Sequence, residues 1–137
     1  MAKSPRRDHW KSEPEDHDYP AALAYLSLLV PPATAAQVVE RLRAAELQHF
    51  KARDLVRASG VELLPACNVH VAADLKKIKR GQRLSPVLLV RGQLSHAVAL
   101  TIADGYHRIC ASYLVDQDAD IPCRLVDATE VRRTRAR

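Results

Sequence analysis

Two apolar runs separated by a short turn constrain the fold of this chain most strongly. Residues 86–90 read Pro-Val-Leu-Leu-Val, and residues 97–103 read Ala-Val-Ala-Leu-Thr-Ile-Ala. Runs of this length joined by a short connection are typical of a β-hairpin. The first run has no polar position, which favours a buried place in a sheet. We therefore expect a sheet that contains this hairpin.

Further strands and helices are expected on both sides of the hairpin. They fall at residues 61–64 and 121–126 for the strands, and at residues 71–80 and 107–115 for the helices. Gly81 closes the first of these helices, and Asp104-Gly105 breaks the chain before the second. The order over residues 61–127 is therefore β-α-β-β-α-β, which predicts an α+β domain.

Helical periodicity prevails before residue 61. Three helices are expected, over residues 21–30, from Thr34 onward and over residues 52–59. Pro20 suits the first turn of the first helix, and Pro residues also end it. Thr34 and Gln37 have the spacing of a capping box, and Gly60 suits a left-handed C-cap. The first two helices look like a hairpin, so residues 19–60 are expected to form a helical preamble packed on the core.

Both ends of the chain are expected to lie outside this packed unit. Residues 1–18 combine four basic with five acidic residues, and Trp10 is their only large apolar residue beyond Met1. Such a segment predicts a flexible N-terminal region, although Trp10 could dock on the domain or on a partner. Residues 128–137 hold four arginines, and we interpret them as a basic C-terminal tail.

Composition narrows the classes of partner. The chain has 137 residues, of which 47% are hydrophobic, enough for the core of one domain. Its formal net charge of +5 favours anionic partners such as nucleotides, nucleic acid or phosphate groups. Three cysteines without a CxxC pair argue against a disulfide framework or zinc site, and predict a cytoplasmic protein. The longest apolar stretch is too short to cross a bilayer, so no membrane partner is expected.

The junction at Asp104-Gly105 carries the clearest chemistry. A strand that ends where a helix begins directs several backbone N–H groups and the positive end of the helix dipole into one small volume. Gly105 would let the backbone approach a phosphate, while His107 and Arg108 would add donors, the arginine in bidentate form. Asp104 has two roles open to it: it caps the helix, or its carboxylate serves a metal-phosphate or a hydroxyl nucleophile. The alternative is a plain turn in which His107 and Arg108 are solvated.

The succession of these elements resembles the ParB/sulfiredoxin superfamily. The matching segments are residues 61–65, 74–81, 85–90, 102–111 and 121–126. The resemblance implies a small mixed sheet over residues 61–127, preceded here by the helical hairpin. It also implies that the junction grips nucleotide phosphates, with Gly105, Tyr106, His107 and Arg108 at the phosphates and Lys77 as a further donor. ATP or CTP with Mg²⁺ is the cofactor that this implies.

Two branches of the superfamily bear on the reaction. Sulfiredoxins carry a catalytic cysteine immediately before the His-Arg pair, and Tyr106 stands there in this chain, which argues against sulfinic-acid reductase activity. The free-serine kinases are similar at the junction, where Asp104, Gly105 and Arg108 match their D-G-x-x-R pattern. Those kinases use a glutamate near the first strand as base. Glu62 is the acidic residue available for that role, provided that its strand faces the pocket.

Two basic groups lie outside the junction. Helical geometry turns Lys76, Lys77 and Arg80 largely away from the apolar stripe of their helix. They form either a solvated face or a contact with nucleic acid or phosphate. Arg53 and Arg57 share a helix face at i,i+4, which suits either a lid over the pocket or a charged outer surface.

The sequence predicts a domain that binds a nucleotide or another phosphorylated ligand, as an ATP- or CTP-dependent phosphotransferase or nucleotide hydrolase. The alternative is a non-catalytic nucleic-acid or protein-binding module of ParB-like type. No metal site made of protein ligands is expected, because the histidines show no metal-ligand spacing. Oligomeric state stays open.

Overall fold

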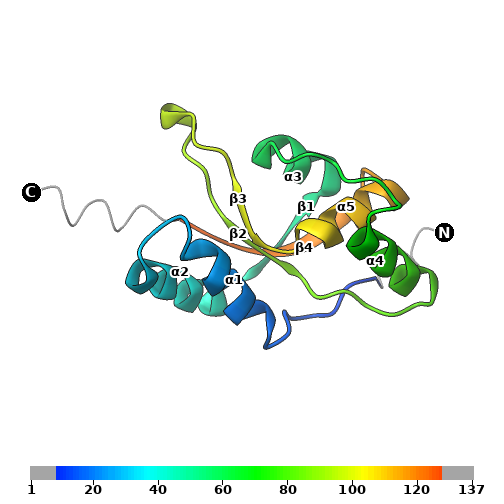
Figure 1. Ribbon diagram of the computed structural model, residues 1–137, viewed down its shortest axis with the longest axis horizontal. Helices are drawn as coiled ribbons and strands as arrows, with labels where there is room; N and C mark the ends of the chain where they lie inside the picture. Colours follow the sequence, from blue (N-terminus) through cyan, green and yellow to red (C-terminus); the bar gives the residue numbers. More distant parts are fainter. Residues whose placement is uncertain (1–8, 128–137) are drawn as a thin grey trace, which may run out of the picture.

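A four-stranded mixed sheet forms the centre of the computed structural model, which describes residues 9–127 (Figure 1). Its strands are β1 (Leu47–Lys51), β2 (Val87–Val90), β3 (Thr101–Asp104) and β4 (Asp120–Val126), in the order β1-β4-β2-β3. The central pair β2 and β4 is parallel, whereas β1 pairs with β4 and β3 pairs with β2 in antiparallel fashion. The expected α+β class and the β2–β3 hairpin are therefore confirmed.

Helices cover both faces of the sheet (Figure 1). They are α1 (Asp18–Leu26), α2 (Pro32–Ala44), α3 (Ala52–Ser59), α4 (Val69–Lys79) and α5 (Tyr106–Val115). On one face, α1 and α2 pack together on the sheet, and on the other face α3 and α5 pack on it. Helix α4 lies beside α5, where Val71 packs against Cys110 and Ala111.

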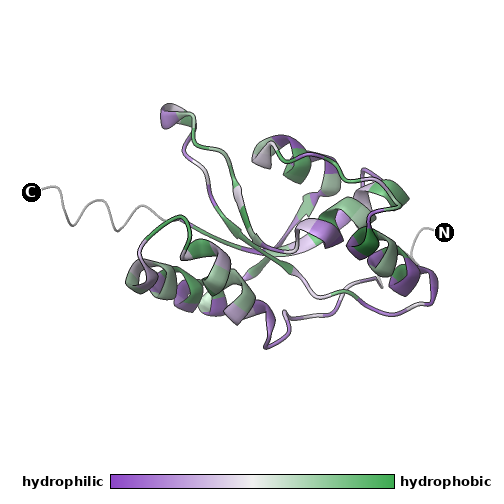
Figure 2. Cartoon of the chain, in the orientation of Figure 1, coloured by the Kyte–Doolittle hydropathy of each residue, from purple (hydrophilic) through white to green (hydrophobic). Residues whose placement is uncertain are grey.

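The apolar run of β2 explains these layers. All four of its residues are buried. Leu88 and Val90 belong to the cluster that contains α1 and α2, while Val87 and Leu89 belong to the cluster under α3 and α5. Successive side chains of a strand point to opposite faces, so a strand with no polar position needs cover on both. Figure 2 shows the matching pattern in the helices, whose apolar sides turn inward.

The first strand of the expected order lies elsewhere than predicted. Residues 61–65 have no regular secondary structure, and the strand that precedes α3 is β1, within the segment expected to be helical. In its register, Phe50 lies opposite Ile121 and His49 opposite Pro122. Strand β1 escaped prediction because it is an edge strand with two exposed polar residues, Gln48 and His49, and so lacks a clear apolar pattern.

The helix ends show which local signals dominate. Gly60, at φ +69°, ends α3 as expected, and Gly81, at φ +78°, follows α4. The capping box predicted at Thr34 and Gln37 is wrong, because α2 begins at Pro32 with Pro31 as its N-cap and no side-chain cap bond. Proline at the first helical position needs no N–H partner and has its φ already set.

The described part of the N-terminal region, which we call the strap (residues 9–17), is anchored to the domain through Trp10. Trp10 is 8% exposed and lies in the same apolar cluster as Leu84 and Ile109. The Lys11 N–H donates to the Leu84 carbonyl at 2.7 Å. Of the two possibilities that the sequence left open for Trp10, the structure shows the one in which it docks on the domain, where burial of the indole offsets the cost of ordering the chain. Residues 1–8 and the expected basic tail, residues 128–137, lie outside the described residues.

The strand expected over residues 97–103 is shorter, because β3 begins only at Thr101. Residues 91–100, which connect β2 to β3, form an extended arm (Figure 1). A 3-10 turn, Leu94–His96, forms the tip of the arm. No helix in the described range, residues 9–127, has the length and hydropathy to cross a membrane.

Candidate functional site

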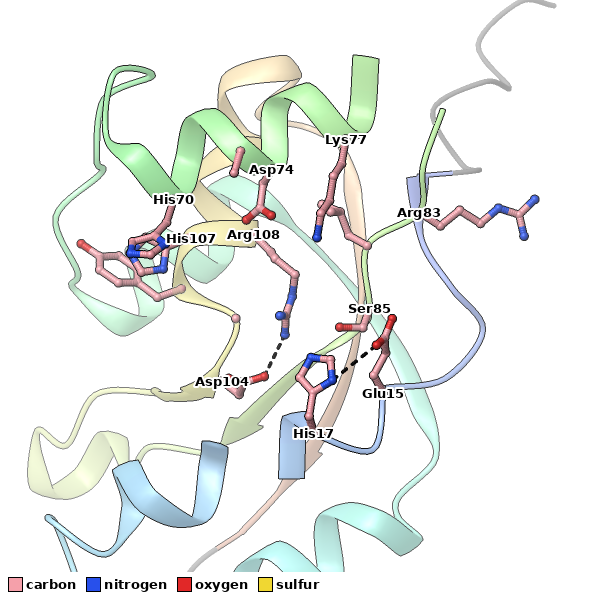
Figure 3. Close-up of a pocket in the computed structure, with 14 residues that line it drawn as sticks. Glu15, His17, His70, Asp74, Lys77, Arg83, Ser85, Asp104, His107 and Arg108 are labelled. Carbon is pink, nitrogen blue, oxygen red and sulfur yellow. Dashed lines mark hydrogen bonds and ion pairs between the residues drawn. The ribbon is translucent and has the colours of Figure 1, made fainter. Parts of the chain in front are cut away.

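A cavity of about 350 Å³ lies where α4, the start of α5 and the strap meet (Figure 3). Its principal side chains are His70, Asp74 and Lys77 from α4, and Asp104, His107 and Arg108 from the junction. Glu15 and His17 of the strap and Ser85 before β2 complete the wall. The volume is within the range of small-ligand pockets.

Gly105 sets the backbone at the mouth of α5. It is the N-cap of the helix at φ +117°, a conformation that side-chain-bearing residues rarely adopt. A Cβ atom there would collide with the Val87 side chain and lie 3.0 Å from a terminal nitrogen of Arg108. No side chain caps the helix, so Asp104 does not fill the capping role that the sequence left open. The first N–H groups of a helix have no intrahelical acceptor, and those of α5 begin beside this cavity.

Arg108 holds two carboxylates at the base of the cavity. Its NH2 donates to Asp104 Oδ2 at 3.0 Å, and its NH1 lies 3.8 Å from Asp18 Oδ1. The Arg108 side chain is 16% exposed and that of Asp18 only 2%. Within the described residues, the buried Nε of Arg108 has no hydrogen-bond partner. The arginine that the sequence assigned to a ligand phosphate is thus also bound to protein carboxylates.

Burial governs the protonation of Asp104. Desolvation raises the pKa of its carboxyl above the ordinary value, and the charge and hydrogen bond of Arg108 act in the opposite direction. Hydrogen bonding and charge from the Asp18 carboxyl raise that pKa further. A carboxyl group with a raised pKa inside a cavity is suited to accept or donate a proton.

The opposite wall of the cavity carries two imidazoles. The His70 and His107 rings have centroids 4.7 Å apart, and the Tyr106 ring lies 5.3 Å from His107. Desolvation first, and then the neighbouring His70, lower the pKa of His107. Desolvation raises the pKa of Asp74, opposed by the charges of Arg108 and Lys77. Burial therefore disfavours the charged forms of both His107 and Asp74 on this wall.

The structure brings most of the predicted junction residues together. Asp104, Gly105, Tyr106, His107, Arg108 and Lys77 all line the cavity. Figure 3 shows Lys77 reaching down from α4 toward it, while Arg83 points away at the rim.

Glu62 is not among the residues that line the cavity. Its side chain is exposed, and its backbone carbonyl accepts a 2.6 Å hydrogen bond from the Tyr106 hydroxyl. The condition that its strand face the pocket fails, because residues 61–65 form no strand. Glu62 therefore anchors Tyr106 through its backbone.

The predicted lid residues pair at the surface. Arg53 lies 2.6 Å from Asp118, and Arg57 lies 3.5 Å from Asp54, all on exposed side chains. Neither arginine lines the cavity, which favours the charged outer surface over the lid.

Lys76 of α4 and Arg80, the C-cap residue of that helix, are exposed and are not part of the cavity wall. The basic run of α4 therefore divides, with Lys77 alone of these three at the cavity.

Sequence reasoning did not assign to the site the strap residues Glu15 and His17, nor Asp18, His70, Asp74 and Ser85. A signal existed for His70 and Asp74, since positions 70, 74 and 77 fall on one face of a helix. Asp18 and Ser85 reach the site through the long-range packing of α1 and β2, which local spacing does not reveal.

Comparisons with models of protein families, with curated proteins and with solved structures found no match to this chain.

Proposed function

We propose that this chain binds a phosphorylated small molecule of the nucleoside phosphate class in the cavity at the start of α5. The observation that carries the proposal is that the N-terminus of α5 opens on the same cavity as Lys77, His107 and the Asp104–Arg108 pair. Backbone N–H groups at a helix start and a lysine on a flexible stem are suited to phosphate oxygens.

The phosphate seat in this proposal is made by the backbone of residues 105–108 and by Lys77. Gly105 leaves the approach open because it has no side chain, and its φ of +117° turns the chain sharply into the helix. His107 adds a neutral donor or acceptor at the side, since its pKa is lowered.

Asp104 would supply the chemistry of a transfer reaction. Its carboxylate would take the proton of an attacking hydroxyl or water as that oxygen forms a bond to the terminal phosphorus of the nucleoside triphosphate. The bond from this phosphorus to the bridging oxygen breaks, and the nucleoside diphosphate leaves with that oxygen. Arg108 would hold that carboxylate in place through their 3.0 Å bond. We infer a phosphotransferase or nucleotide hydrolase on this basis.

ATP or CTP with Mg²⁺ stays the proposed ligand. Within residues 9–127, no cluster of three or more His, Cys, Asp or Glu side chains is placed to hold a metal. Mg²⁺ is commonly bound through one or two carboxylates together with substrate phosphates. In the alternative in which Asp104 serves the metal-phosphate and not the nucleophile, it is the carboxylate that would contribute here, and the ion would supply charge neutralisation on the phosphates.

Membership of the ParB/sulfiredoxin superfamily is part of the same proposal. Its support is the D-G-Y-H-R segment at residues 104–108, which stands at a strand-to-helix junction facing a cavity. The mixed sheet and the β2–β3 hairpin are compatible with it.

The test is calorimetric titration of the chain with ATP, CTP and ADP, with and without Mg²⁺. We expect binding that weakens about 10-fold or more in Lys77→Ala, because a charge-assisted hydrogen bond contributes about 1.5–3 kcal/mol. Lys79→Ala is the matched control, since Lys79 lies on the same helix but outside this cavity. Absence of binding at millimolar ligand, or equal effects of the two variants, would contradict the proposal.

The nucleic-acid module remains the second candidate because Lys76 of α4 and Arg80, its C-cap residue, are exposed. Under that function, replacing both by alanine would weaken duplex binding and reduce its salt dependence. Lys77→Ala would then change duplex affinity no more than the replacement of any other single lysine. A loss of nucleotide affinity confined to Lys77→Ala favours the first candidate.

A further inference from the structure

We propose that Asp18 and Asp104 keep a single proton between their carboxyl groups, against the one positive charge of Arg108, and that an anionic ligand at the start of α5 binds together with that proton. Asp18 is then a positioning residue for the site, although it lies far from the junction in sequence. The inference rests on the proposed function for its ligand, but the carboxyl pair itself can be tested in the free protein.

The geometry joins three elements at one guanidinium. Arg108 comes from α5, Asp104 from the end of β3 and Asp18 from the first position of α1. The two terminal nitrogens of Arg108 are directed to different partners, NH2 to Asp104 at 3.0 Å and NH1 to Asp18 at 3.8 Å. The carboxyl of Asp18 is also fixed from its own side, since its Oδ2 accepts the Glu15 N–H at 2.9 Å.

The charges at this point do not balance when both carboxyl groups are ionised. Two carboxylates with side-chain exposures of 2% and 18% face one guanidinium of 16% exposure. A buried negative charge without a partner is costly, and two carboxyl groups at one site keep a proton to avoid it. The direction in which the pKa of Asp104 moves, raised first by burial and then also by Asp18, agrees with this count.

Other titratable and charged groups surround the pair. The strap contributes Glu15 and His17 to the same cavity, and α5 contributes His107. Helix α4 contributes His70, Asp74 and Lys77. Arg43 of α2 and Arg124 of β4 act on Tyr19, the residue after Asp18. His17 Nε2 lies 3.5 Å from Asp18 Oδ1, but its side chain is 76% exposed. Solvent screening makes an exposed imidazole a weak counter-charge. The charge of Lys77 acts on Asp74 of its own helix, whose pKa it lowers against the larger effect of burial.

A phosphate at the start of α5 would bring further negative charge toward Asp104. Like charge disfavours the ionised form, so the pair would hold its proton more tightly when the ligand is bound. Binding and proton uptake are then linked, and affinity falls with rising pH by up to about tenfold per pH unit while the pair titrates.

The linkage is measured by calorimetry of ADP binding in two buffers of different ionisation enthalpy, which gives the number of protons taken up. Asp18→Asn is the test variant, since the amide oxygen can still accept from the Glu15 N–H. Asp16→Asn is the matched control, because Asp16 is exposed in the same segment. Protons exchanged by the ligand and by the rest of the cavity are common to all three proteins and cancel in the comparison.

We expect wild type and Asp16→Asn to take up more protons than Asp18→Asn, and the pH dependence of affinity to flatten in Asp18→Asn alone. Equal proton uptake in all three proteins would overturn the inference. An affinity of Asp18→Asn that is reduced by the same factor at every pH would also overturn it, because it would show a structural effect alone.

The free protein gives the independent test, by carbon-13 NMR titration of its aspartate carboxyl groups. Two linked steps at Asp18 and Asp104, one of them above the ordinary carboxyl range, support the proton pair even when no nucleotide binds and the proposed function fails. Independent titration of both groups in the ordinary range, about pH 4, would overturn the pair even when nucleotide binds.

Discussion

The guanidinium of Arg108 donates to the carboxylate of Asp104 at 3.0 Å, one helical turn apart across the point where β3 ends and α5 begins. The same guanidinium reaches Asp18 of α1 at 3.8 Å. One side chain thus ties the strand, the helix that follows it and the first helix of the chain to the wall of a cavity.

Removing this guanidinium should destabilise the fold. Arg108→Ala leaves two carboxylates of low exposure without their cation, and we expect a loss of about 2–4 kcal/mol in the free energy of unfolding. Urea denaturation measures it. Arg57→Ala, at a side chain that is 80% exposed, serves as control and should change stability by less than about 0.5 kcal/mol. Similar losses in both variants would show that Arg108 does not carry this role.

Gly105 should tolerate no side chain. Its φ is +117°, and a Cβ atom would lie 2.7 Å from Val87 Cβ. We expect Gly105→Ala to cost more than about 2 kcal/mol of stability, through backbone strain and overpacking together. Gly60→Ala has a positive φ but open space around the Cβ position, so it should cost only about 1 kcal/mol. Chemical denaturation of both variants measures the two losses. Equal losses of stability would show that a Cβ atom at position 105 does not collide with Val87.

The pH dependence of stability should carry a contribution from Asp74. Desolvation raises the pKa of its carboxyl in the folded state, so the folded protein keeps a proton that the unfolded chain has lost. This penalty is absent below the ordinary carboxyl pKa and grows as the pH rises through the raised value. Asp74→Asn removes it, so the variant should gain stability relative to wild type between acid and neutral pH.

Denaturant unfolding at several pH values gives that difference. A difference that stays constant, or one that shrinks as the pH rises, would contradict the assignment.

Trp10 should anchor the strap to the domain. It is the only tryptophan of the chain and is 8% exposed, so its fluorescence reports on this contact directly. We expect Trp10→Ala to lower stability by about 3–5 kcal/mol and Trp10→Phe to lower it by less. In the native wild type, iodide should quench the emission poorly, and efficient quenching would mean that the indole is exposed.

Local patterns predict the elements whose sequence matches their environment. Strand β2 is apolar at every position because both of its faces are covered, and Gly60 ends α3 because it can take a positive φ. The start of α5 follows from Asp104-Gly105, where the chain breaks after an apolar strand. These features depend on residues close together in the sequence, and the apolar or turn-forming character of those residues indicates their burial or their backbone conformation.

The features that were missed depend on distant parts of the chain. Strand β1 lies at the edge of the sheet and pairs only with β4, and its exposed Gln48 and His49 leave no apolar alternation to detect. Asp18 belongs to the site because α1 packs beside β3, and Trp10 is buried because Leu84 lies beside it. Glu62 was assigned to a strand that does not form, so its expected role at the pocket had no structural basis.

The most direct test of the central claim is to follow the backbone amide resonances of the chain by NMR while ATP is added with Mg²⁺. We predict that the largest shifts fall on Gly105, Tyr106, His107 and Arg108 and are reduced in Lys77→Ala, with no comparable change at the exposed basic side of α4. Shifts centred on Lys76 and Arg80, or no shifts at millimolar ATP, would contradict a phosphate site at the start of α5.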